Sequence, residues 1–197
     1  MILKETEIRK SVEEEYSNVA DKPFEKHLFP VGREFALNIG YPSDIIKEIP
    51  ENAVNSFSGV SDISIIADIK QGNNVLDLGC GAGLDSLIAA KKTGDRGRVF
   101  GLDFSPSMIA KAKASAEEMK ISNLEFKVND AEEISLLDKS IDIAMVNGIF
   151  NLNKDRNRIF DELSRILKKG GTVYSAELIL KDDLDEGILQ DEKNWFT

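Results

Sequence analysis

The sequence predicts an α/β fold with a doubly wound, mostly parallel sheet, because short apolar segments alternate with longer amphipathic ones from Val75 onward. The apolar segments lack a strict in–out alternation, which is typical of strands that helices cover on both faces. One helix carries a clear start signal, since Ser105 is a preferred N-cap residue and Pro106 fits the first helical turn. Strands are predicted at residues 75–78, 99–102, 124–128, 141–146 and 172–176, and helices at 84–92, 106–119 and 155–167, with Gly170 as the stop signal of the last.

The first 60 residues have a different pattern and predict a helical cap. Residues 5–20 have the periodicity of an amphipathic helix. Three prolines and two glycines interrupt residues 22–42, so we expect an irregular segment there. Short helices are expected at residues 43–49, 50–57 and 62–70. We therefore divide the chain into an N-terminal cap, residues 1–60, which covers a site, and a core, residues 61–197.

The composition is that of a globular domain: of the 197 residues, 42% are hydrophobic and 30% are charged. The net charge of −10 disfavours electrostatic binding to nucleic acid or to an anionic membrane. The N-terminus has no apolar segment behind a basic start, and no 18-residue apolar run follows, so we expect a cytoplasmic protein. Cys80 is the only cysteine, which allows neither an internal disulfide nor a multi-cysteine site, and no metal is expected.

The most informative motif is the segment 75–85, Val-Leu-Asp-Leu-Gly-Cys-Gly-Ala-Gly-Leu-Asp. An apolar strand runs into a glycine-rich turn that opens a helix, so a ligand can approach bare backbone and the first N–H groups of the helix. A dinucleotide fingerprint requires a glycine at position 84, where this chain has leucine, and the lysine of a P-loop is also missing. The spacing therefore disfavours a diphosphate ligand.

Polar residues stand at the carboxyl ends of the next three predicted strands, on the edge of an open α/β sheet where ligands bind. Asp103 can accept hydrogen bonds from both hydroxyls of a ribose, and Phe104 can lie against a purine ring. Asp130 can accept from an adenine amino group, and Asn147 ends the fourth strand. Acids at strand ends also cap helices, but three polar ends beside one glycine loop favour a nucleoside site.

With these motifs, residues 40–180 resemble the class I S-adenosylmethionine-dependent methyltransferases, and within them the arsenite methyltransferase-like group. The segments that carry the resemblance are 53–60, 75–85, 97–103 and 167–171. The resemblance implies a Rossmann-like methyltransferase fold, S-adenosylmethionine as cofactor and S-adenosylhomocysteine as product. The cofactor-binding residues that it implies are Asp77, Gly79, Cys80, Gly81, Gly83, Asp103, Phe104, Asp130, Ala131 and Asn147.

The resemblance also implies a role for most of these residues. It places the methionine part of the cofactor against Asp77, Gly79 and Gly81. The remaining implied roles are ribose binding by Asp103, adenine packing by Phe104, recognition of the adenine edge by Asp130 and the Ala131 amide, and a place beside the reactive sulfonium for Asn147. No catalytic residue is assigned.

Two features depart from the arsenite methyltransferase pattern. Members of that group hold trivalent arsenic with several thiolates, one of them at the position of Gly148, whereas this chain has only Cys80, so arsenite is disfavoured as the substrate. The family sheet ends in two further strands, and the residues after 176 are too few for a helix and two strands. The chain is therefore expected to be a fragment or a short form, and in a short form the exposed fifth strand could pair in a homodimer.

The leading hypothesis is methyl transfer to a small-molecule acceptor by in-line displacement, with orientation and exclusion of water supplied by the protein. The only histidine, His27, is expected in a surface or packing role, and Cys80 in a packing role. Tyr16 and Tyr41 are expected in the core, with cofactor or substrate contact as the alternative. A non-catalytic protein that binds S-adenosylmethionine is a second hypothesis, and a NAD-dependent oxidoreductase, which must accommodate Leu84, is a third.

Overall fold

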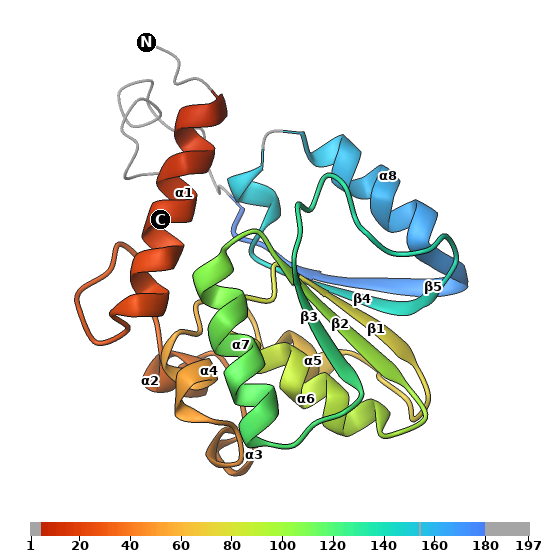
Figure 1. Cartoon of the computed structure of the whole chain (residues 1–197), viewed down its shortest axis with the longest axis horizontal. Helices are drawn as coiled ribbons and strands as arrows, with labels where there is room; N and C mark the ends of the chain where they lie inside the picture. The colour runs from red at the N-terminus through yellow and green to blue at the C-terminus, as the bar shows by residue number, and fades with distance from the viewer. Residues whose placement is uncertain (1–4, 154, 180–197) are drawn as a thin grey trace.

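The sheet has five parallel strands in the order β3-β2-β1-β4-β5, as the computed structural model of residues 5–153 and 155–179 shows (Figure 1). The winding direction reverses at β1, because β2 and β3 lie on one side of it and β4 and β5 on the other. Ligands bind open sheets beyond the carboxyl ends of the strands at such a reversal. All five strands overlap the predicted ones: β1 (Asn74–Leu78), β2 (Arg98–Asp103), β3 (Leu124–Val128), β4 (Ile141–Asn147) and β5 (Leu167–Ala176).

Helices cover both faces of the sheet, which confirms the doubly wound arrangement (Figure 1). Val75 of β1 belongs to a buried cluster with Ala89 of α6, and Leu76 belongs to a different buried cluster with Ile159 of α8. Successive side chains of a strand point to opposite faces, so a fully apolar strand needs a helix layer on each side. The helices of the core are α6 (Leu84–Thr93), α7 (Pro106–Glu118) and α8 (Arg156–Ile166).

Helices also precede the sheet, as predicted for residues 5–20, 43–49 and 50–57. The longest of them, α1, lies along α7 (Figure 1), where Val19 is buried in a cluster with Met108. The division into a cap of residues 1–60 and a core stays a prediction. The helices of this part are α1 (Glu5–Asp21), α2 (Arg33–Asn38), α3 (Ser43–Lys47), α4 (Glu51–Asn55) and α5 (Ile63–Ile66).

Two predictions for the N-terminal part were wrong in detail. α2 lies inside the segment predicted to be irregular, since residues 33–38 contain no proline or glycine and bury Ala36 in the core. α5 ends at Ile66 rather than near residue 70, because the Lys92 ammonium group binds the carbonyl oxygens of Ser64 and Ala67, each at 2.8 Å.

The last strand also begins earlier than predicted. α8 ends at Ile166 and β5 begins at once, so Gly170 lies inside the strand, with φ of 84°, instead of closing the helix. Within residues 5–153 and 155–179, β5 pairs with β4 alone. Residues 180–197, on which the prediction of missing strands depends, lie outside the described residues. Homodimerisation through β5 therefore stays a prediction.

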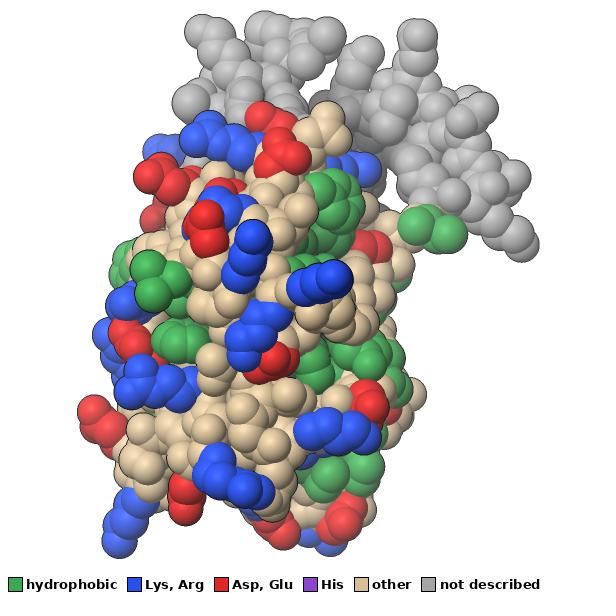
Figure 2. All heavy atoms as spheres, turned by 90° about the vertical axis from the view of Figure 1, so that its right-hand side faces the viewer, with side chains coloured by type: hydrophobic (Ala, Val, Ile, Leu, Met, Phe, Trp, Pro, Cys, Tyr) green, Lys and Arg blue, Asp and Glu red, His purple; other side chains and the backbone are tan. Residues whose placement is uncertain are grey.

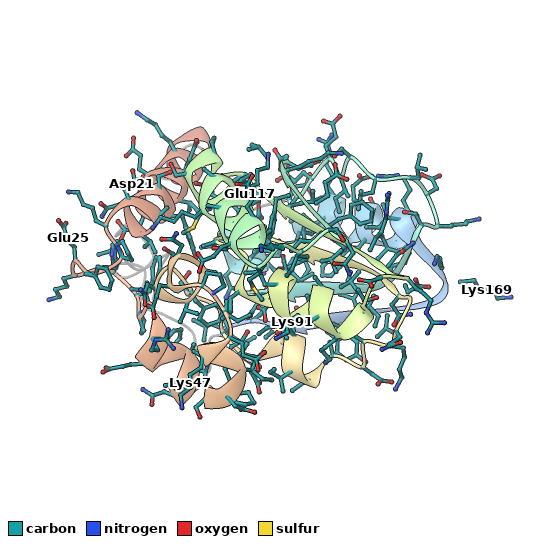
Figure 3. The ribbon with its side chains drawn as sticks, turned by 60° about the horizontal axis from the view of Figure 1, so that its bottom comes forward. Asp21, Glu25, Lys47, Lys91, Glu117 and Lys169 are labelled. Carbon is teal, nitrogen blue, oxygen red and sulfur yellow. The ribbon has the colours of Figure 1, made fainter. Side chains whose placement is uncertain are left out.

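Charged side chains of both signs cover the outside of the domain. Lys47, Lys91 and Glu117 project from three different helices in Figure 3, and Lys91 forms an ion pair with Glu48 that links α6 to the end of α3. On the face shown in Figure 2, acidic and basic side chains are interspersed. Among the described residues, no helix combines the length and the apolar character that crossing a bilayer requires.

Candidate functional site

The glycine loop after β1 is a tight turn that β2 holds in place. The backbone amides of Gly79 and Cys80 donate to the carbonyl oxygen of Leu102, at 2.8 and 3.0 Å. Gly79, Gly81 and Gly83 all have left-handed backbone angles, with φ of 75°, 50° and 91°. Only glycine adopts this region without strain, so the turn depends on the motif.

The three glycines differ in what surrounds them. A Cβ at Gly79 would overlap Ile149, and a Cβ at Gly83 would come within 2.7 Å of Phe126 Cζ, so close packing requires glycine at both positions. A Cβ at Gly81 would meet no atom of the other described residues within 4 Å, its two chain neighbours aside. Gly81 is therefore the glycine that leaves open space for a ligand.

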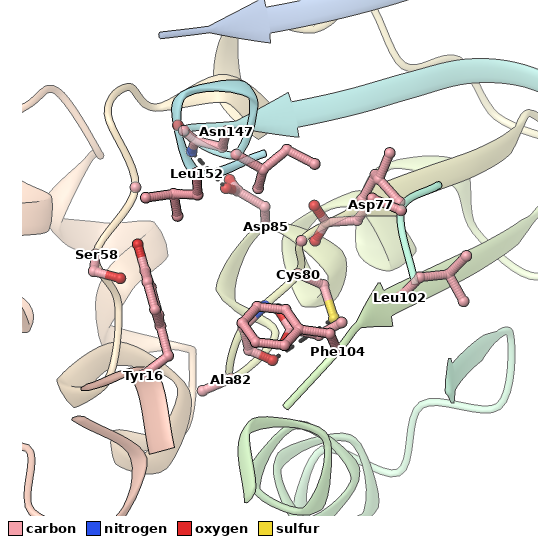
Figure 4. Close-up of a pocket in the computed structure, with 18 of the residues that line it drawn as sticks. Tyr16, Ser58, Asp77, Cys80, Ala82, Asp85, Leu102, Phe104, Asn147 and Leu152 are labelled. Carbon is pink, nitrogen blue, oxygen red and sulfur yellow. Dashed lines mark hydrogen bonds between the residues drawn. The ribbon is translucent and has the colours of Figure 1, made fainter. Parts of the chain in front are cut away.

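A cavity opens beyond the carboxyl ends of β1, β2 and β4, and it brings the predicted site residues together (Figure 4). Gly83 is the exception, because it lies against Phe126 and is not among the residues that line the cavity, so its contact with the cofactor stays a prediction that this geometry does not favour. The predicted residues that line the cavity are Asp77, Gly79, Cys80, Gly81, Asp103, Phe104, Asp130, Ala131 and Asn147.

Most of the other lining residues were not indicated individually by the sequence, although Tyr16 was named as an alternative contact of the cofactor or substrate. Asp85 stands in the first turn of α6, where an acid is explained by the helix dipole alone, so nothing marked it as a site residue. The N-terminal part and the turn after β4 also lie far from the motif along the chain. From these two segments the cavity is lined by Val12, Tyr16, Ala53, residues 56–59, Gly148, Ile149, Leu152 and Asn153.

Asp103, at the end of β2, is a buried carboxyl group with acceptor capacity to spare. It is 7% exposed; Oδ2 accepts from the Gly81 amide at 2.9 Å and Oδ1 from the Ser105 amide at 2.8 Å. Burial raises the pKa of the Asp103 carboxyl to about 6, although the two hydrogen bonds lower it. A carboxylate offers about four acceptor positions, so two further donors can bind here.

Two more buried carboxyl groups line the same cavity. Asp77 Oδ2 accepts from the Ser86 hydroxyl at 2.5 Å. Asp85 Oδ1 accepts from the Tyr41 hydroxyl at 2.5 Å and from the Ser64 amide at 3.2 Å. Burial raises the pKa of both carboxyls, and the charge of Asp85 raises the pKa of Asp77 further.

Asn147 lines the cavity, but its side-chain amide is fully engaged within the protein. Oδ1 accepts from the backbone amides of Val60 and Ser61, at 2.8 and 3.1 Å. Nδ2 donates to the Ser61 carbonyl oxygen at 2.8 Å and to Asp85 Oδ2 at 3.0 Å. The amide thus ties the N-terminal segment to the end of β4, and its predicted place beside the sulfonium stays a prediction that this geometry does not favour.

The remaining candidates are Tyr16, Cys80 and His27, and their surroundings indicate structural rather than chemical roles. Tyr16 faces Ser58 in the cavity (Figure 4), and burial raises the pKa of Tyr16 above its usual range, so the hydroxyl stays protonated. Burial also raises the pKa of the Cys80 thiol, which agrees with a packing role. His27 does not line the cavity, and its Nε2 lies 2.9 Å from the Lys22 carbonyl oxygen.

The charge of the cavity is one-sided. Four aspartates are among the described residues that line it, whereas lysine, arginine and histidine are not. Buried carboxylates without a cationic partner are unfavourable, so the cavity is complementary to a ligand that carries positive charge and unsuited to a diphosphate. The fold and this site define a nucleoside-binding α/β domain for a cationic cofactor.

The chain belongs to the methyltransferase domain family, whose model matches residues 69–196. It is 29% identical over 153 residues to an arsenite methyltransferase of Halobacterium salinarum, which covers 78% of this chain and 39% of that protein. It is 32% identical over 113 residues to a demethylmenaquinone methyltransferase of Bacillus mycoides, which covers 57% of this chain and 47% of that protein.

A solved structure is also similar to this chain and also belongs to a methyltransferase. The structure of an arsenic(III) S-adenosylmethionine methyltransferase from Chlamydomonas reinhardtii matches with a TM-score of 0.63 and 28% identity, over 83% of this chain and 56% of that chain. These similarities confirm the Rossmann-like methyltransferase fold and the relation to the arsenite methyltransferase-like group. The family implies S-adenosylmethionine as the cofactor. The chain spans less than half the length of the two curated relatives.

Proposed function

We propose that this chain transfers a methyl group from S-adenosylmethionine to a small-molecule acceptor. The observation that carries the proposal is the charge of the cavity, where Asp77, Asp85 and Asp103 are buried without a lysine, arginine or histidine among the described lining residues. S-adenosylmethionine bears a sulfonium, an ammonium and a carboxylate group, so its net positive charge would supply the missing positive charge. The net charge of −10 supports a small molecule rather than a nucleic acid as the acceptor.

The residues around the cavity fit this cofactor. Gly81 leaves its backbone open to a ligand, and Asp103 retains two acceptor positions for the ribose hydroxyls. We assign Asp77 to the methionine ammonium group, because its carboxylate is buried with the Ser86 hydroxyl as its hydrogen-bond partner. Phe104 would pack on adenine, and Asp130 with the Ala131 amide would read its edge.

When bound, the cofactor supplies an electrophilic methyl group, so the protein needs no nucleophile of its own. The buried carboxylates stabilise the positive charge of the reacting centre in a region of low dielectric constant. The apolar residues of the N-terminal part, such as Val12 and Phe57, exclude water from the cavity. The main contribution of the chain is then the orientation of the acceptor.

Two measurements test the proposal. Mass spectrometry of small molecules released from the purified protein tests the identity of the cofactor, and calorimetry compares S-adenosylmethionine, S-adenosylhomocysteine and NAD. We expect the first two to bind and NAD to fail, because its diphosphate would lie among the aspartates. Production of S-adenosylhomocysteine with thiol, amine, naphthoquinol and arsenite acceptors tests methyl transfer. Cofactor binding without product over the whole panel would favour the non-catalytic binding protein instead.

The relatives do not indicate one acceptor, since their printed names differ in it. Within the 197 residues Cys80 is the only thiol, so these residues alone do not provide several thiolates for arsenic. We therefore propose an acceptor other than arsenite. Efficient methylation of arsenite by this chain would refute that choice.

A further inference from the structure

The cavity residues that come from the N-terminal part and from the turn after β4 have a composition of their own. Figure 4 shows Tyr16, Ser58 and Leu152 grouped on the side opposite Leu102. The apolar residues that the N-terminal part and the turn after β4 contribute to the cavity are Val12, Ala53, Phe57, Ile149 and Leu152. We call this group, with Tyr16 and Ser58, the acceptor wall. It comes from two distant parts of the chain, the N-terminal part and the turn after β4.

The acceptor wall itself contains no lysine, arginine or histidine, and the Lys111 ammonium group that lies near it is engaged with the Ser56 hydroxyl at 3.3 Å. Its polar groups are hydroxyls, and the Tyr16 hydroxyl stays protonated because burial and the nearby Asp103 carboxylate both oppose its ionisation. Asp85, on the same cavity, accepts from Asn147 and Tyr41. An anionic group on the acceptor would therefore lose its hydration in a cavity that holds four aspartates and offers neutral groups, such as hydroxyls and the Asn153 amide, in return.

The charge balance of the transfer step also favours an uncharged acceptor. The acceptor's lone pair forms the bond to the methyl carbon while the carbon–sulfur bond breaks and its electron pair stays on sulfur. With an uncharged acceptor, the unit of positive charge passes from sulfur to the acceptor and stays in the cavity until a proton leaves for water. The buried carboxylates then lie beside a positive charge before and after transfer, first on sulfur and then on the acceptor. If the acceptor were anionic, methyl transfer would leave no positive charge on it.

We propose that the acceptor is an uncharged small molecule with an apolar body, and that the cavity rejects acceptors bearing a carboxylate or phosphate. The inference rests on the proposed function. It names the chemical class of the second substrate from the charge and composition of the acceptor wall. An arene or alkyl body would pack on Phe57 and Leu152, and a nucleophilic atom with a free lone pair would face the methyl group.

Matched thiols test the inference, because they keep the nucleophile and change only the charge. Benzyl mercaptan and its para-carboxylate are compared for production of S-adenosylhomocysteine at pH 7.5. We expect kcat/KM to be at least about tenfold higher for the uncharged thiol, a factor that corresponds to about 1.4 kcal/mol. Equal or faster turnover of the carboxylate would overturn the inference.

Charge variants provide the second test. Leu152→Lys adds a cation to the acceptor wall and should reduce the ratio of kcat/KM for the uncharged thiol to that for the carboxylate at least threefold. Ser58→Lys repeats the test if the first variant does not fold. Leu137→Lys makes the same change at a leucine that is 81% exposed and outside the cavity, and the preference should not change. An unchanged preference in a folded Leu152→Lys protein that binds S-adenosylhomocysteine would overturn the inference.

The failure of the inference can be distinguished from that of the proposed function. Without affinity for S-adenosylmethionine or S-adenosylhomocysteine in calorimetry, the proposed function itself is wrong. If the cofactor product binds, saturation-transfer NMR in its presence reports whether benzyl mercaptan enters the cavity. If the cofactor product binds but the uncharged thiol shows neither NMR contact nor turnover, the further inference is wrong and the proposed function is not affected.

Discussion

Asp103 allows the sharpest test, because its burial and its binding role predict opposite responses to pH. Burial raises the pKa of the folded carboxyl from the usual 3.8 to about 6. The folded state therefore holds the proton more tightly than the unfolded state, and the associated stability is present below pH 3.8 and lost as the pH rises through 6. The shift of about 2 pH units corresponds to about 3 kcal/mol.

Asp103→Asn removes this ionisation. The free energy of unfolding from urea titrations should fall by about 2 to 3 kcal/mol between pH 4 and pH 8 in the wild type relative to the variant. An offset between the two proteins that does not depend on pH is expected as well, since the amide can accept from only one of the Gly81 and Ser105 N–H groups.

Ligand binding should show the reverse trend. The ribose hydroxyls need the ionised carboxylate, so S-adenosylhomocysteine should bind about tenfold more weakly at pH 5 than at pH 7.5, given a pKa of about 6 in the free protein. In Asp103→Asn this part of the pH dependence should vanish, and the Kd at pH 7.5 should rise at least about tenfold. Calorimetric profiles of wild type and variant that differ only by a constant factor would refute the reasoning.

Three further predictions follow from the geometry of the site. Gly81→Ala should lower the Tm only through the strain of its left-handed backbone angle and should lose S-adenosylhomocysteine affinity in calorimetry. Gly83→Ala should lower the Tm further, because its Cβ also meets Phe126; the opposite order of Tm values would contradict the roles assigned to these glycines. Tyr41→Phe should lower the free energy of unfolding by about 1.5 to 3 kcal/mol, because the buried Asp85 carboxylate loses a hydrogen-bond donor. Tyr174→Phe on β5 serves as the control in the same urea titrations. Asp77→Asn should raise the free energy of unfolding of the unliganded protein at pH 8, because the raised pKa of Asp77 makes its ionisation there unfavourable. The same variant should bind S-adenosylmethionine more than tenfold more weakly. A variant that is less stable and binds normally would refute the assignment of Asp77 to the methionine ammonium group.

Most of the fold could be predicted because its signals are local. The apolar segments and their spacing located all five strands, and the pair Ser105–Pro106 located the start of α7, where the Ser105 hydroxyl accepts from the Met108 amide at 3.4 Å. The errors arose where distant residues decide the local structure. Gly170 looks like a helix stop, but pairing with β4 extends the chain there from Leu167.

The site was predictable in part for the same reason. The glycine loop and the polar strand ends are fixed to the carboxyl edge of the sheet, so their residues converge once the topology is known. Asp85 was not identified, and Asn147 was interpreted only as a neighbour of the sulfonium, because their mutual hydrogen bond joins side chains 62 residues apart. Gly83 has the same motif position in sequence as a ligand-contacting glycine, and only Phe126 from β3 shows that it serves packing.

The sequence by itself determined the class of fold and the edge of the sheet that carries the site, because hydrophobic periodicity and turn chemistry act between near neighbours in the chain. The cofactor followed from the resemblance of the chain's motifs to those of the class I methyltransferases. Only the tertiary structure decided the character of the cavity: which carboxyls are buried, which amide is already engaged, and that no cation is among the described residues that line it. Burial and charge at a point in space depend on every segment that surrounds it, and here those segments lie between Val12 and Asn153, far apart along the chain.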